Sequence, residues 1–585
     1  MPLIAEHLCA PAAYGACVSV ANAACAARAR WMGLGMEAIV LALFAAGLLR
    51  GITDPSLGYA DADRILLDGV FVLDFLRDLP WRDPFAYAVD YYTHFPALSI
   101  GYRPPLLPLA EAFFNGLLGV HISSARLAVV TFGLIGMSAW FRWIRWEFGL
   151  ALAVVASALL ATTVFVVQWG WYTMSELPVL SLALLSAYHF ARYLDTDVTW
   201  RLYVAAFVAV GALYTKQTAV FLLPVFVFWA FERGRVGELI RRPEIWVATA
   251  CSAVLLVPLA AMTLWLGALN IEQSVDFGAR QAGGLLSWAN LRAHPANLIE
   301  QHVGWPALGM AALGLLYVIW ARERRAVRFL LLVLGVYLTF TTLNVTSARY
   351  AIAWIPVFCL LAALAIEWRR IHRALGAATC ALVACTFGYQ AFATATEPLR
   401  FASGYEAAAD AVMHAYGGRP ILVDAYNNGY LIYFLRQRNR ARDLYVLRGD
   451  KLLSSSAITA TKWLEVHART DDDIKDLIDR AGVRFVVVEE RDYTGVPIHS
   501  RLRGFLKTDL FSLYQSIPIV SNRSVSTLKD EPPLGNQSIL IYEYRNPAPL
   551  RDAVPLELPV PLVGTRLNTM LRPKPDAPKS SSPAQ

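Results

Sequence analysis

The stretch WVATACSAVLLVPLAAMTLWLGA, residues 246–268, runs for 23 residues without a charged side chain. A helix of about 20 apolar residues crosses the hydrocarbon core of a bilayer, so the stretch is typical of a membrane span. Similar apolar stretches recur along the chain. We predict a mainly α, polytopic membrane helix bundle of about 11 spans, at residues 33–50, 124–141, 150–166, 177–193, 201–214, 218–232, 246–268, 304–320, 328–345, 351–366 and 374–391.

The composition supports a membrane protein and excludes several other classes. Of 585 residues, 57% are hydrophobic and only 17% are charged, against about 25% charged in soluble domains. This excludes a soluble enzyme, a fibrous protein and a disordered protein. The net charge is +7, but the basic residues form small clusters between apolar blocks, so we expect no nucleic-acid partner. The seven cysteines contain no CxxC spacing, which argues against a zinc or redox site.

The distribution of basic residues predicts the orientation. Short loops on one side hold more Lys and Arg than the longer loops opposite, which places the N-terminus in the cytoplasm. The basic loops alternate between the two sides only if residues 104–120 do not cross the membrane, which favours an interfacial helix there and not a span. The 17 basic residues on the predicted cytoplasmic side are Arg28, Arg30, Arg142, Arg145, Arg192, Arg201, Arg233, Arg235, Arg241, Arg242, Arg322, Arg324, Arg325, Arg328, Arg369, Arg370 and Arg373.

Two large regions are predicted to lie outside, on the side of the membrane opposite the cytoplasm. A cytoplasmic leader (1–30) precedes a membrane domain (31–395) with a long first outside loop (51–123), and such loops are usually functional. A small outside α/β domain (396–545) follows, and its Pro- and Ser-rich tail (546–585) has the composition of a disordered segment. Within the domain we predict strands at 420–424, 444–447, 483–489 and 539–544, helices at 405–416 and 471–481, and a turn at 427–429.

Polar residues that could carry chemistry gather at the predicted outer ends of spans. The first loop begins YADADR, with Asp61 and Asp63, and ends YYTHFPALSIGYRPPL, with Arg103 before two prolines. A carboxylate there could act as a general base, and an arginine on a stiff segment suits a phosphate. An acidic loop can equally be a solvated surface, and Arg-Pro-Pro can anchor an interfacial helix.

Three further motifs lie on the same side. Ser-Glu-Leu-Pro begins at 175 and contains Glu176, Thr-Lys ends at Lys216, and Arg349-Tyr350 begins a span. Each could be a simple membrane-edge anchor, but ionisable groups next to apolar spans often mark sites. We expect them to line one cavity with negative and positive poles, suited to a lipid-linked phosphate that carries a sugar.

The order of these motifs resembles the GT-C glycosyltransferases that use polyprenyl-phosphate sugars, notably the protein O-mannosyltransferase and aminoarabinose transferase group of glycosyltransferase family 39 type. The likeness covers roughly residues 35–370. Two departures matter. The family's adjacent Asp-Glu is here Asp61-Ala-Asp63, which leaves the identity of the base open. Its Lys-Pro-Pro-Leu is here Arg103-Pro-Pro-Leu, which keeps the charge but changes its geometry.

The resemblance implies transfer of a hexosyl or pentosyl group from a polyprenyl phosphate to a glycan, lipid or protein acceptor at the periplasmic face of a cell inner membrane, in cell-envelope or lipopolysaccharide modification. Asp61, Asp63 and Glu176 are then the candidate catalytic residues. The cations would stabilise the phosphate leaving group. The candidate phosphate ligands are Arg103, Lys216 and Arg349, and the candidate substrate contacts are Tyr92, His94 and Tyr102.

Other functions stay open at the level of sequence. A divalent cation, Mg²⁺ or Mn²⁺, is compatible with the resemblance, but no dense carboxylate cluster requires one, so we assign no metal ligand. A flippase or transporter of lipid-linked saccharides is the first alternative, although no internal repeat is visible. A polysaccharide polymerase or ligase is the second.

Overall fold

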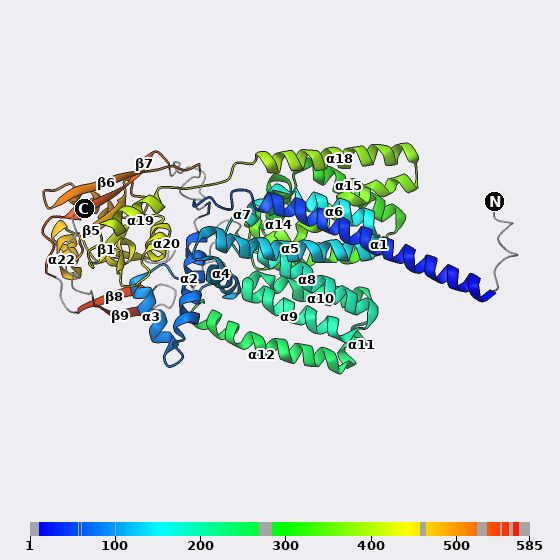
Figure 1. The fold of residues 1–585 in the computed structure, drawn as a ribbon, viewed down its shortest axis with the longest axis horizontal. Coiled ribbons are helices and arrows are strands. Elements are labelled where there is room, and N and C mark those ends of the chain that lie inside the picture. The colour runs from blue at the N-terminus through cyan, green and yellow to red at the C-terminus, as the bar shows by residue number, and fades with distance from the viewer. Residues whose placement is uncertain are drawn as a thin grey trace.

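The computed structural model describes residues 11–56, 58–59, 61–99, 101–267, 283–456, 464–522, 535–549, 553–560 and 565–572. Figure 1 shows the membrane helices running side by side, with an α/β unit at one end of them beside α2 and α3. The N-terminal part of α1 projects from the opposite end. The fold therefore joins a helical membrane body to an extramembrane unit, as the sequence predicts.

Eight helical segments of the described chain are long and apolar enough to cross a membrane. A ninth candidate is a pair of helices, α6 (Leu150–Ala161) and α7 (Val164–Trp171), which meet at a bend of 57°. The eight are Ala27–Leu48 within α1 (Pro11–Leu48), α5 (Ile122–Phe148), α8 (Glu176–Thr196), α12 (Pro243–Trp265), α15 (Gly304–Ala321), η3 with α16 (Arg324–Thr342), η4, α17 and η5 together (Ala348–Arg370), and α18 (Arg373–Thr396).

Two shorter apolar segments complete the predicted set of 11. They are α9 (Thr199–Thr215) and η1 with α10 (Gln217–Glu232). Every predicted span therefore coincides with a helix or a broken helix, although the number that cross the bilayer is approximate. Within the described residues, the remaining helices of the body are α11 (Val236–Arg241), α14 (Trp288–Asn297) and η2 (Leu298–His302).

The predicted first loop is helical over most of its length. It contains α2 (Ala62–Asp78), α3 (Pro84–His94) and α4 (Leu106–Leu118). Helix α4 falls within the segment predicted to be an interfacial helix, and it packs on α2 and α5. Gly69 of α2 permits this approach, because a Cβ atom there would lie 2.6 Å from the buried Glu111 carboxylate.

Large aromatic side chains fill the half of the membrane body farther from the α/β unit. Trp143 of α5 lies 4.5 Å from Phe329 and 5.6 Å from Trp229, measured between ring centroids, and all three are fully buried. Such contacts fix the helices in register, because tilted and edge-on aromatic pairs have a preferred geometry. They hold α5 against α10 and α16.

The C-terminal unit is a three-layer α/β sandwich. Its five-stranded sheet has the order β2-β1-β5-β7-β6, with β1 parallel to β2 and β5, and β7 antiparallel to its neighbours. Alternate residues of each strand face opposite layers. The elements are α19 (Tyr405–His414), β1 (Ile421–Asp424), α20 (Asn428–Arg438), β2 (Val446–Arg448), α21 (Gly449–Leu452), β3 (Ser454–Ser456), β4 (Leu464–Val466), α22 (Asp471–Ala481), β5 (Phe485–Glu489), α23 (Pro497–Phe505), β6 (Phe511–Ile519) and β7 (Gln537–Tyr544).

Two details correct the sequence reading of this unit. The predicted turn at 427–429 is instead the start of α20, whose residues 428–436 are all buried. Part of the tail predicted to be disordered forms a hairpin of β8 (Val554–Val560) and β9 (Thr565–Leu571). Composition misjudged the tail because Val554 and Leu571 join a hydrophobic core of the α/β unit, where β8 contacts α21 and β9 contacts α3. The prediction for residues 573–585 lies outside the described chain.

The α/β unit docks on the first extramembrane region through buried polar contacts. Arg436 of α20 pairs with Asp74 of α2 and donates to the Tyr91 hydroxyl at 2.8 Å. Arg448 donates to the Pro96 carbonyl at 2.7 Å. These contacts hold the unit over the ends of the spans where the predicted site residues lie.

Candidate active site

Five of the nine predicted site residues form one connected set of ion pairs, which we call the ionic cluster: Asp61, Arg103, Glu176, Lys216 and Arg349. They come from five separate segments of chain. Each stands at or next to a helix end or a break between helices, where the backbone is free of the regular helix and side chains can converge. The sequence prediction that these charges share one environment therefore agrees with their positions.

Asp61 is held between two arginines. Its Oδ1 lies 3.0 Å from a terminal nitrogen of Arg103, and its Oδ2 lies 3.6 Å from one of Arg349. Arg103 also donates to the Asp61 carbonyl at 2.9 Å, and Pro104 and Pro105 restrict the backbone after it. The Asp61 side chain is 39% exposed, so a second reactant can reach the carboxylate.

Glu176 forms the second anionic centre and is fully buried at the first residue of α8. Its Oε1 accepts a hydrogen bond from Lys216 Nζ at 2.6 Å and lies 3.7 Å from Arg349 Nε. Its Oε2 has no hydrogen-bond partner in the described chain. A buried carboxylate oxygen without a partner is costly, and here it is available to a donor on a bound molecule. Arg349 connects the two carboxylates.

Tyrosine side chains enclose the cations. Tyr59 accepts from Arg349 at 3.1 Å, and its ring packs on Trp169 at 5.2 Å between centroids. Lys216 Nζ lies 4.8 Å from the centroid of the Tyr350 ring. The sequence reading missed Tyr59 as a site residue, although it stands two positions before Asp61. Tyr350 was noted only as a neighbour of Arg349.

Burial and charge shift the pKa values of acidic groups at the site in opposite directions. Burial alone would raise the pKa of Asp61, but Arg103, Arg349 and Arg64 lower it to about 2. Burial raises the pKa of Asp63 to about 6, because Arg64 offsets it only in part and the negative charge of Asp61 adds to it. At neutral pH the arginines therefore stabilise the charged form of Asp61, whereas burial destabilises the charged form of Asp63.

Asp63 points away from the ionic cluster, towards the α/β unit. A Cβ atom at Gly429 of α20 would lie 2.1 Å from Asp63 Oδ2, so the glycine is what allows α20 to approach. The Asp63 side chain accepts a hydrogen bond from the Arg64 backbone at 2.6 Å. Its position favours a role in docking over contact with substrate.

Two of the predicted substrate contacts also lie at the docking surface. His94 stacks on Tyr445 at 4.0 Å between ring centroids, and Tyr92 packs against the cores of the α/β unit. Tyr102 instead borders the ionic cluster, since the charges of Arg103 and Asp61 both act on its hydroxyl. Helix α3 carries the first two onto the other unit, so a contact of Tyr92 or His94 with substrate stays a prediction.

The residues of the ionic cluster do not fit a resident divalent cation. Across the ranges that the structure describes, no three His, Cys, Asp or Glu side chains come together as metal ligands. The two carboxylates of the ionic cluster are each neutralised by arginine or lysine. We therefore derive no step through a metal.

Sequence comparison adds one family match. The family described as dolichyl-phosphate-mannose-protein mannosyltransferase matches residues 102–265. That segment holds Arg103, Glu176 and Lys216 of the ionic cluster. A search of curated proteins found no match.

Solved structures match the whole architecture at low identity. ArnT from Cupriavidus metallidurans bound to undecaprenyl phosphate is 13% identical, with a TM-score of 0.51, over 89% of this chain and 100% of that one. The Archaeoglobus fulgidus oligosaccharyltransferase in complex with Zn and sulfate is 13% identical, with a TM-score of 0.50, over 77% of this chain and 68% of that one. The predicted resemblance is thereby confirmed: this chain has the fold of the GT-C glycosyltransferases.

Proposed function

We propose that the chain is a multi-pass inner-membrane glycosyltransferase that moves a sugar from a polyprenyl-phosphate donor to an acceptor at the periplasmic face. The N-terminus is then cytoplasmic and the α/β unit periplasmic. The fold supports this proposal, as does the undecaprenyl phosphate bound to the similar ArnT. The acceptor is a hydroxyl group of a cell-envelope glycan, lipid or protein.

The charge of the ionic cluster is the observation that carries the proposal. Its three cations and two carboxylates leave one positive charge in excess. A polyprenyl-phosphate sugar is a phosphodiester with one negative charge, so it would neutralise that excess. When the bond between sugar and phosphate breaks, negative charge grows on the phosphate, and preorganised cations stabilise that change.

Asp61 is the residue that we assign to the acceptor. A carboxylate with a pKa of about 2 is a weak base. When the donor phosphate binds Arg103 and Arg349, these arginines stabilise the negative charge of Asp61 less. The pKa of Asp61 therefore rises. The carboxylate then accepts the proton of the acceptor hydroxyl as its oxygen bonds to the anomeric carbon and polyprenyl phosphate departs. Base strength would thus increase only when donor is present.

Glu176 and Lys216 take complementary roles in this proposal. The free Oε2 of Glu176 accepts a hydrogen bond from a sugar hydroxyl, which orients the ring. Lys216 donates a hydrogen bond to Glu176 and adds positive charge next to the phosphate. Asp63 is not assigned to the reaction, because it packs against α20.

The test uses purified protein in liposomes with a panel of undecaprenyl-phosphate sugars and an inner-membrane lipid extract as acceptor. We expect acceptor-dependent release of undecaprenyl phosphate, reduced at least about a hundredfold in Asp61→Asn, as loss of a general base predicts. Asp90→Asn is the matched control, because Asp90 lies in the same region and its side chain is 74% exposed. Full turnover in Asp61→Asn would overturn the assignment of the base, and loss of turnover in Asp63→Asn alone would move the assignment to Asp63.

A binding measurement tests the phosphate role separately. Arg103→Gln should weaken undecaprenyl phosphate binding about tenfold, the value of one charge-assisted hydrogen bond. If Arg103→Gln and Arg349→Gln both bind undecaprenyl phosphate with unchanged affinity, the ionic cluster is not the phosphate site. No release of undecaprenyl phosphate with any sugar of the panel would count against the transferase itself.

A further inference from the structure

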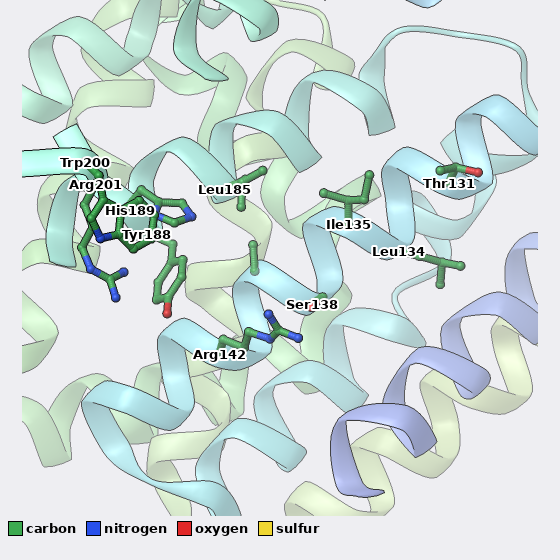
Figure 2. Close-up of a pocket in the computed structure, with 11 residues that line it drawn as sticks. Thr131, Leu134, Ile135, Ser138, Arg142, Leu185, Tyr188, His189, Trp200 and Arg201 are labelled. Carbon is green, nitrogen blue, oxygen red and sulfur yellow. The ribbon is translucent and has the colours of Figure 1, made fainter. Parts of the chain in front are cut away.

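A cavity of about 560 Å³ lies between α5, α8 and α9, on the membrane body and away from the ionic cluster. Figure 2 shows that its lining is divided in two. His189 and Arg201 gather with Trp200 at one end, Leu134 and Ile135 lie at the other, and Arg142 lies between them. We propose that this cavity binds an anionic phospholipid, independently of the proposed function.

The polar end of the cavity has spare positive charge. No carboxylate is among the residues that line it. Arg201 lies over the Trp200 ring at 4.7 Å, and its Nε has no hydrogen-bond partner in the described chain. The buried Nδ1 of His189 also has none. A phosphate oxygen would accept from the Arg201 guanidinium in a short, charge-assisted bond.

Arg142 is only partly neutralised. Its Nε donates at 2.8 Å to the buried Glu37, which also accepts from Ser138. Its Nε is the nitrogen that pairs with this carboxylate, and the side chain is 56% exposed. A guanidinium anchored through one edge keeps its remaining donors in a fixed plane for a second anion.

The apolar end selects an amphiphile over a soluble phosphate. Leu134, Ile135 and Leu185 line it, and Ile135 is 41% exposed although α5 is a candidate span. In a bilayer this wall faces hydrocarbon and accommodates an acyl chain, while the phosphate sits among the arginines. The arrangement therefore fits a whole lipid, with head and tail on successive turns of α5.

The cavity belongs to the other half of the membrane body. His189 and Glu176 lie on the same helix, thirteen residues apart, which is about 20 Å along its axis. Trp200 and Arg201 begin α9, and Lys216 follows its end. A lipid here would occupy the leaflet opposite the ionic cluster and brace the two helices that lead to Glu176 and Lys216.

The experiment measures lipid binding to delipidated, full-length protein by native mass spectrometry. We expect dioleoyl phosphatidylglycerol to bind about tenfold more tightly than dioleoyl phosphatidylcholine. Arg142→Gln/Arg201→Gln should bring the two lipids within about twofold. The control is Arg241→Gln/Arg324→Gln, which removes the same charge from exposed positions and should keep the tenfold preference.

Further arms separate the sources of phosphate and guard against misfolding. Inorganic phosphate and glycerol phosphate should not compete with the lipid, and competition at equal concentration would overturn a lipid site in favour of a free anion. Ile135→Trp fills the apolar end without touching the charges, and it should lower binding of both lipids. Equal affinity of the wild type for the two lipids, an unchanged preference in the arginine variant, or unchanged binding of both lipids in Ile135→Trp would each overturn the proposal.

Discussion

Replacement of Lys216 by methionine tests whether the ionic cluster is a coupled unit. Glu176 is fully buried, and Lys216 Nζ at 2.6 Å is its nearest cation, with Arg349 at 3.7 Å as the second. Removal of one partner from a buried pair costs about 3–5 kcal/mol, because the other charge is left uncompensated. Since Arg349 remains, we expect Lys216→Met to lower the free energy of unfolding by about 3 kcal/mol.

The double variant distinguishes a buried charge from lost packing. In Glu176→Gln/Lys216→Met no uncompensated charge remains, so the loss of stability should be about 2 kcal/mol smaller than the sum of the two single losses. Unfolding is followed in mixed micelles by titration with sodium dodecyl sulfate. Lys507→Met, at an exposed position, is the control and should change stability by less than about 0.5 kcal/mol. Single losses that simply add would refute the coupling.

Three further substitutions and titrations follow from the same contacts. The pKa of Asp63, about 6, lies above its ordinary 3.8. The protonated form therefore contributes to stability fully below about pH 4, and this contribution is lost as the pH rises through 6. Asp63→Asn should raise the melting temperature at pH 8 and leave it unchanged at pH 4. Arg436→Ala leaves Asp74 buried without its cation and should cost about 3–5 kcal/mol, seen as faster hydrogen exchange in α2 and α20, whereas unchanged exchange would contradict the docking contact. Burial alone would lower the pKa of His499, but its hydrogen bond to Asp424 raises it. Protection of β1 and α23 from hydrogen exchange, corrected for the intrinsic rate, should therefore fall as the pH rises through that raised pKa. Protection that does not depend on pH would exclude this contribution.

The fold was largely predictable because hydrophobic length carries most of the information in a membrane protein. The predicted span 246–268 overlaps α12 (Pro243–Trp265) almost fully. The predicted span 150–166 is less accurate, because the chain bends at Thr162 and Thr163 and continues as α7. A hydropathy average does not detect such a bend, because the two threonines hardly interrupt the apolar pattern. Their hydroxyls donate to backbone carbonyls of the preceding turn.

The sequence predicts which candidate site residues lie on the same side of the membrane. It does not predict which of them contact the α/β unit. Asp61, Arg103 and Glu176 stand at or near ends of helices that face one side, and the parity of the spans predicts this common side. His94 obeys the same parity, yet α3 carries it to Tyr445 of the α/β unit. A contact between residues 351 positions apart in sequence leaves no periodic signal in either segment, so no pattern in the first loop could indicate it.

The cations of the ionic cluster are already paired with its carboxylates, and this sets a limit on donor affinity. Arg103 and Arg349 contact Asp61 through the same guanidinium groups that we assign to the phosphate. Donor binding must therefore weaken existing ion pairs, so part of the phosphate's interaction energy is offset by the loss of carboxylate contacts. The same exchange raises the pKa of Asp61 when the donor is bound. If the two events are linked, Asp61→Asn should bind undecaprenyl phosphate more tightly than the wild type while it loses turnover. Weaker binding in that variant would mean that Asp61 supports the phosphate site and does not compete for its cations.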